Sequence, residues 1–139
     1  MSGEEEVVSE ILKVSRRLQK TVTSDLDGDQ LSRIALKLAS YKVTLGGFVA
    51  EARLSRDEAE AQYLHTREQS YKTHRAEGKA IGDSDNLKRI ESEEEYQAYI
   101  KASYNFERLR NLHNDCHDMI DSVRSRLIHL LGERGDQNG

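Results

Sequence analysis

The chain of 139 residues contains no proline and no tryptophan, one cysteine, two phenylalanines and two methionines. The absence of proline favours long uninterrupted helices, because proline removes a helical hydrogen bond and clashes with the preceding turn. A single cysteine cannot form an intrachain disulfide, so nothing points to a secreted protein. With so few large apolar side chains, we expect a lean core in which helices bury narrow apolar faces against one another, within or between chains.

We expect neither a membrane-spanning nor a targeting segment. No apolar run approaches the ~20 residues that are needed to cross a bilayer. The first residues, Met-Ser-Gly-Glu-Glu-Glu, have neither the basic start nor the apolar core of a signal peptide. We therefore expect a cytoplasmic protein without membrane contact. Its length suits one domain, which we place at residues 1–132, followed by a polar tail at 133–139.

The spacing of the apolar residues is helical throughout. Apolar side chains recur at alternating steps of three and four, which places them on one face of a helix. The helical pattern that ends at about residue 131 is expected to be disturbed near Ser92–Glu95. The pattern predicts an all-α fold, in which a short N-terminal helix accompanies a long antiparallel helical hairpin that assembles as a homo-oligomer. The expected helices cover about residues 4–22, 29–76 and 87–131.

Capping and glycine residues mark where these helices start, bend and end. Asp27 and Gln30 have the spacing of a capping box at the start of the second helix. Gly46-Gly47, inside that helix, predicts a bend or a close approach of another helix. Glycines and polar turn formers at 77–86 predict an exposed, mobile connection, and Gly132 is expected to end the last helix.

The last helix carries the cleanest apolar seam, with a heptad alternation typical of coiled coils. We expect this seam to form the core or the oligomer interface. A metal site is the alternative for His113, Cys116 and His117, because two imidazoles and a thiol lie within little more than one turn. Core packing is favoured, since two of the three lie on the seam, and no metal or other cofactor is expected. The seam residues are Phe106, Leu109, His113, Cys116, Ile120, Val123 and Leu127.

The charged residues give a net charge of −4, which argues against general nucleic-acid binding. Their distribution qualifies that argument. Between residues 61 and 81, four lysines and arginines stand against two glutamates. The later turns of the first helix are basic as well, with Lys13, Arg16, Arg17 and Lys20. A solvated face is the favoured interpretation of these four, and a contribution to phosphate binding is the alternative.

Tyrosines alternate with cations at the end of the second helix. Tyr63, Arg67 and Tyr71 are spaced by four, so they share one surface of a helix. Aromatic faces between cations can stack single-stranded bases while phosphates are neutralised beside them. Alternatively, the tyrosines pack the tip of the hairpin and the cations solvate it. The candidate DNA-binding residues are Tyr63, Arg67, Tyr71, Lys72, His74, Arg75 and Lys79.

Parts of the chain resemble the phage recombination mediators, the UvsY-like proteins. The similarity lies in Leu36–Arg53 leading into a basic segment, and in Asp115-Cys116 followed by Met119–Arg126 in the last helix. The resemblance implies a small all-helical protein, cytoplasmic in the host if phage-encoded, that binds single-stranded DNA and forms rings. It also implies a recombinase and a single-strand-binding protein as partners. In this chain the basic cluster is sparser than in the family.

These observations lead to two functional hypotheses. The first is a single-stranded DNA-binding recombination mediator that positions DNA for a recombinase. The second is a helical adaptor or inhibitor that binds another protein through the hairpin and contacts no DNA. No serine or cysteine stands in a recognisable nucleophile setting, and the carboxylates occupy expected solvated faces, so we expect no catalytic residues and no enzyme.

Overall fold

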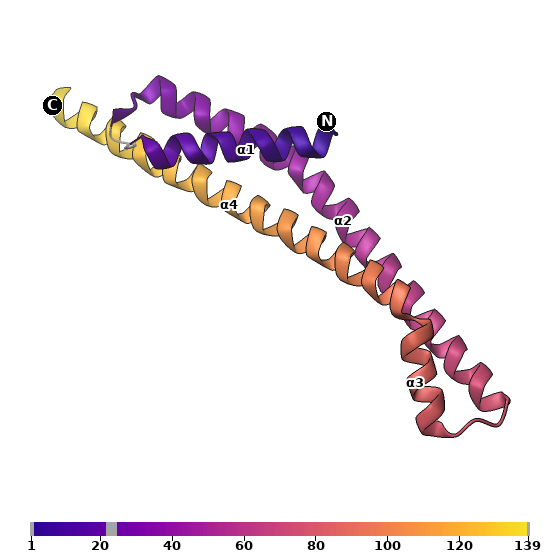
Figure 1. Cartoon of the computed structure of the whole chain (residues 1–139). Helices are drawn as coiled ribbons and strands as arrows, with labels where there is room; N and C mark the ends of the chain where they lie inside the picture. Colours follow the sequence, from indigo (N-terminus) through magenta and orange to yellow (C-terminus); the bar gives the residue numbers. More distant parts are fainter. Residues whose placement is uncertain (1, 22–24, 139) are drawn as a thin grey trace. The chain divides into compact units, whose positions relative to one another are not determined.

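A computed structural model describes residues 2–21 and 25–138, with side chains as far as residue 132 (Figure 1). Every regular element in this part of the chain is a helix, which confirms the all-α prediction. None of these helices is long and apolar enough to cross a membrane. The four helices are α1 (Gly3–Lys20), α2 (Gly28–Ala76), α3 (Ile81–Glu91) and α4 (Glu93–Asn138).

The short helix α1 starts at a complete capping box. The Glu5 backbone N–H donates to Ser2 Oγ, and the Ser2 N–H donates to a carboxylate oxygen of Glu5. Glutamates in the first turn and basic residues in the last complement the helix dipole. The helix ends at Lys20, slightly before the expected end at Val22, and residues 22–24 lie outside the described part.

The long helix α2 starts as predicted. The Gln30 N–H donates to Asp27 Oδ1 at 2.8 Å, and the Asp27 N–H donates to Gln30 Oε1 at 3.0 Å, which completes the capping box. Gly46-Gly47 does not interrupt the helix. A Cβ atom on Gly46 would lie 3.7 Å from His113 Nε2, so this glycine lies where α4 packs against α2. The close approach of another helix was one of the two roles expected for the pair.

The segment after α2 differs from the prediction of an exposed connection at 77–86 and one helix over 87–131. Gly78 ends α2 with a φ of +86°, a conformation that glycine adopts without strain. A separate helix, α3, then forms at Ile81–Glu91, with an acidic first turn and a basic last turn. Its N-cap is Ala80, which offers no side-chain hydrogen bond to the helix. The glycines and turn formers indicate a loop, but the acidic first turn and basic last turn complement the helix dipole and favour a helix.

Ser92 separates α3 from α4, inside the disturbance expected at Ser92–Glu95. Its hydroxyl donates to the Lys88 carbonyl, and its own N–H bonds to the same oxygen. A serine side chain that competes in this way for a helical carbonyl favours a local break.

The prediction that Gly132 ends the last helix is wrong, because α4 continues to Asn138. A single glycine inside a helix costs only about 1 kcal/mol relative to alanine, and the residues after it include good helix formers. The side chains of the expected polar tail, and Gly139, lie outside the described part of the chain.

The chain divides into two compact units that share the two long helices. Unit 1 comprises Met1–Val49 and Leu109–Gly139, and unit 2 comprises Ala50–Arg108. In unit 1, α1 lies beside the first part of α2 and the last part of α4 (Figure 1). In unit 2, α3 joins the remaining parts of α2 and α4. The single domain expected at residues 1–132 stays a prediction.

The apolar seam of α4 is covered within one chain. Cys116 is fully buried in unit 1, and its Sγ lies 3.3 Å from the Leu38 carbonyl oxygen, to which the thiol donates. Because Cys116 and its buried neighbours on the seam are already covered within one chain, no second copy is needed to cover them. His113 and Leu127 are half-buried. The buried seam residues are Phe106, Leu109, Cys116, Ile120 and Val123.

Candidate anion-binding surfaces

We call the candidate DNA-binding residues between Tyr63 and Lys79 the predicted strip. The first of them, Tyr63, packs inside unit 2. The ring of Tyr63 stacks on Tyr99 with centroids 6.3 Å apart and planes within 2°. Its centroid lies 5.2 Å from that of Tyr96, with the rings tilted by 47°. Tyr71 is half-buried, and Lys88 Nζ lies 5.0 Å from its ring centroid in a cation–π contact. The strip thus places its tyrosines in contacts between helices of unit 2.

His74, a second member of the strip, belongs to a hydrogen-bonded cluster that joins α2 to α3. Its Nε2 lies 2.8 Å from a carboxylate oxygen of Glu91, and the Ser70 hydroxyl donates to the other oxygen at 2.6 Å. Both hydrogen bonds lower the pKa of Glu91, and the one from Ser70 has the larger effect. His74 is only 9% exposed, so this cluster is a structural clamp, named here the α2–α3 clamp.

The cations of the strip lie beside acceptors of the protein itself. Lys72 Nζ is 2.9 Å from Glu68, and Lys79 Nζ is 3.3 Å from Glu77. Arg75 donates to the Lys79 carbonyl oxygen at 2.7 Å. Lys72 and Arg75 are nevertheless exposed, while Arg67 and Lys79 are half-buried. The structure therefore keeps two exposed cations near the tip, in a surface that also carries carboxylates.

A second basic surface lies in unit 1, in a groove between α1 and α2 with a volume of about 350 Å³. Within the described residues, no ion pair or hydrogen bond engages the side chain of Arg17, Arg33 or Lys37. We call these three residues the α1–α2 cations. The groove is lined by Val14, Arg17, Gln30, Arg33, Ile34 and Lys37.

The local sequence explains why this groove is basic. Residues 13–20 contain four cations and no carboxylate, and residues 30–50 contain three cations and no carboxylate. Acids flank these segments: Glu10 pairs with Lys13 at 3.1 Å, Asp27 caps α2 and Asp29 lies in its first turn. The pattern of alternating tyrosines and cations did not single out Arg33 and Lys37, because no tyrosine alternates with them. The like charges at i and i+4 were the available signal.

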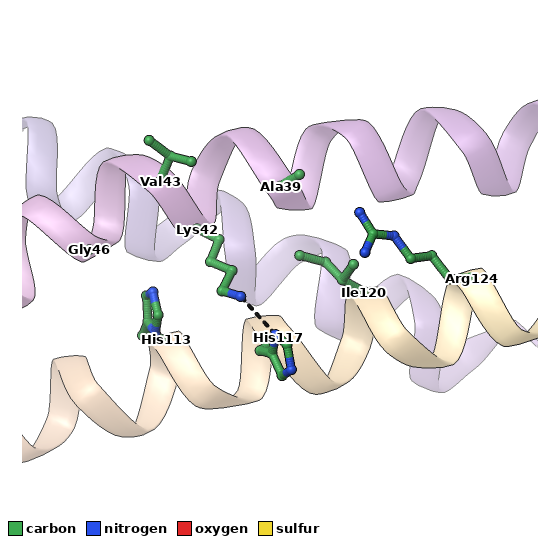
Figure 2. Close-up of a pocket in the computed structure, with 8 residues that line it drawn as sticks. All are labelled: Ala39, Lys42, Val43, Gly46, His113, His117, Ile120 and Arg124. Atoms are coloured by element: carbon green, nitrogen blue, oxygen red, sulfur yellow. Dashed lines mark hydrogen bonds between the residues drawn. The ribbon is translucent and has the colours of Figure 1, made fainter.

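A third surface, the groove between α2 and α4 in unit 1, carries two histidines and two cations (Figure 2). Lys42 extends from α2 towards α4, and its Nζ lies 2.7 Å from His117 Nδ1. The other ring nitrogen of His117 lies 3.2 Å from Asp121 Oδ2. Burial lowers the pKa of His113, and the nearby Lys42 and His117 lower it further.

The metal alternative for His113, Cys116 and His117 gains no support from this geometry. Cys116 is buried against the Leu38 carbonyl, and burial raises the pKa of its thiol. Both nitrogens of His117 already have partners. Among the described residues, no three histidine, cysteine or acidic side chains gather in a way that would hold a metal ion.

Comparison with known proteins finds no matching family model, no matching curated protein and no matching solved structure. The resemblance to the recombination mediators therefore rests on the residues quoted from the sequence.

Proposed function

We propose that the protein binds single-stranded DNA in support of recombination, and that the α1–α2 cations hold its phosphates. The observation that carries this proposal is that Arg17, Arg33 and Lys37 line one groove without an anionic partner among the described residues. Arg33 and Lys37 are one turn apart, and like charges at that spacing destabilise a helix slightly. A bound phosphate would remove this repulsion and release counterions from the DNA.

The groove supports the phosphate-binding part of the proposal. The preference for single-stranded DNA and the link to a recombinase rest on the family resemblance. The predicted strip in unit 2 is retained as a second candidate surface, through its exposed Lys72 and Arg75. The α1–α2 cations are the stronger candidate of the two. They lie in sequence segments without carboxylates, whereas Lys72 is already paired with Glu68.

Binding is tested by anisotropy of a labelled oligothymidine over a series of salt concentrations. Arg33→Gln with Lys37→Gln should weaken binding and flatten the slope of log affinity against log salt by about 1.4, because each lost phosphate contact removes about 0.7. Lys72→Gln with Arg75→Gln measures the unit 2 strip in the same way. The matched control is Arg53→Gln with Lys101→Gln, two exposed cations outside both surfaces.

The results separate the hypotheses. A larger loss for the unit 2 pair than for the α1–α2 pair would move the site to the predicted strip. Competition with unlabelled duplex DNA tests the strand preference, which the single-strand proposal requires to be clear. If the wild type binds no oligonucleotide near physiological salt, DNA binding is excluded and the adaptor hypothesis replaces it.

The adaptor hypothesis has an observation of its own. Leu36 and Val43, seven residues apart on α2, are 73% and 80% exposed. That spacing places both on one face of the helix. A protein partner that packs along this face would cover both side chains.

A further inference from the structure

The groove between α2 and α4 has the dimensions of a small ligand site. Its volume is about 340 Å³, at the lower end of the range for ligand pockets. Apolar residues of both helices, Ala39, Val43 and Ile120, line part of it (Figure 2). Gly46 adds no side chain on the side that faces His113.

The charges in this groove are predominantly positive. Lys42 from α2 and Arg124 from α4 are its cations, and no carboxylate lines it. Asp121, outside the lining, is engaged by His117 at 3.2 Å. Helix α1 contributes no residue to the groove.

The contact between Lys42 and His117 leaves the ammonium charge uncompensated. An ammonium group has no lone pair, so Lys42 donates and His117 Nδ1 accepts. The proton of the ring is then on Nε2, where it faces Asp121. The bond satisfies a hydrogen of Lys42 with a neutral acceptor. Arg124 likewise has no ion-pair partner among the described residues.

We propose that this groove binds a phosphate-type dianion, either free orthophosphate or the phosphate of a small phosphomonoester, between Lys42, Arg124 and the His113 imidazole. Two permanent cations match a dianion better than a carboxylate, which would neutralise only one of them. The apolar part of the groove would receive the organic group of a phosphomonoester. This site is independent of DNA binding, because none of the α1–α2 cations lines it.

Anion binding should be coupled to protonation of His113. Its pKa is lowered by burial, by Lys42 and by His117, and a bound dianion would favour the protonated ring and so raise this pKa. Since the pKa would then be higher in the bound state than in the free state, affinity should rise as the pH falls through the bound-state pKa. The rise should level off below the free-state pKa. Sulfate is the suitable probe, because its charge stays constant over this range.

The test follows the ring resonances of His113 by NMR during titration with sodium sulfate, at ionic strength held constant with sodium chloride. We expect saturable binding with a Kd on the order of 1 mM or below, a rise in the His113 pKa, and tighter binding at about pH 5.5 than at about pH 7.5. Lys42→Met and Arg124→Met should each weaken binding at least about tenfold, a loss typical of one charged hydrogen bond.

Controls keep the result interpretable. Arg53→Met and Lys101→Met remove exposed cations elsewhere and should leave sulfate binding unchanged. Circular dichroism establishes that each variant is folded. Sulfate stabilises folded proteins in general, so it should raise the midpoint of thermal unfolding of the wild type by more than that of Lys42→Met. Comparison of orthophosphate with phenyl phosphate identifies the source of the anion, because only the ester gains from the apolar lining.

The proposal is overturned if sulfate binding does not saturate, or if folded Lys42→Met and Arg124→Met bind sulfate as the wild type does. Loss of DNA binding in the Arg33/Lys37 variant with intact sulfate binding would separate this site from the proposed DNA surface.

Discussion

At the residue scale, side chains that could react or bind a ligand are engaged by partners within the fold. Cys116 could be a reactive thiol by its chemistry, but it is fully buried and donates to the Leu38 carbonyl. His74 could bind phosphate, but it holds a carboxylate of α3. Residue type and spacing identified both as candidates, and their partners in the fold determine what they can do.

Cys116 should react slowly with thiol reagents in the native protein. Burial raises the pKa of its thiol and blocks access, so the native reaction should be much slower than that of the urea-unfolded chain. Cys116→Ala should lower the free energy of unfolding by about 1–2 kcal/mol. Absorbance with a disulfide reagent and urea titration measure the two effects. A native rate equal to the unfolded rate, or stoichiometric zinc that survives gel filtration, would contradict this assignment.

At the element scale, the hydrogen bonds of the α2–α3 clamp join α3 to α2. Glu91 accepts from Ser70 and bonds to His74, while large apolar residues of α3 such as Ile81 and Ile90 are exposed. An element that rests on so little apolar burial opens more readily than a core helix.

Glu91→Gln should therefore loosen α3, and the effect should depend on pH. The pKa of Glu91 is lowered in the folded state, so its contribution is present above the unfolded-state pKa and is lost as pH falls through the folded-state pKa. Hydrogen exchange of the α3 amides should be faster in the variant at neutral pH, and the difference should vanish in acid. Glu94→Gln, an exposed carboxylate nearby, is the control. Equal exchange in variant and wild type at pH 7 would show that the clamp does not hold α3.

At the scale of the whole molecule, self-association needs a surface other than the α4 seam. Ile120 is 4% exposed within one chain, so a charge there should unfold the protein whatever its oligomeric state. Leu36 and Val43 are the two most exposed large apolar residues of α2, and a second copy could cover them.

We expect a homo-oligomer that uses the face of α2 with Leu36 and Val43. Leu36→Lys with Val43→Lys should lower the mass from light scattering while helicity is retained, because both side chains point to solvent in the single chain. Ile90→Lys, which places a charge at an exposed apolar residue of α3, should leave the mass unchanged. A monomeric mass for the wild type at micromolar concentration would end the oligomer hypothesis.

The sequence by itself determined the helical class, the capping box of Asp27 and Gln30, and the break near Ser92. Each of these depends on residues a few positions apart, because helical periodicity and capping are local. The same local signals are weaker where glycines interrupt them. They therefore predict a connection where α3 forms, and a helix end at Gly132 where α4 continues.

Only the tertiary structure decided which faces meet. Arg17 and Arg33 share a groove because α1 folds back along α2, and Lys42 reaches His117 across 75 positions of sequence. Tyr63 finds its partners on another helix for the same reason. A helical pattern specifies that a face is apolar or charged. The packing of the helices specifies what that face contacts, and hence which cations remain available for an anion.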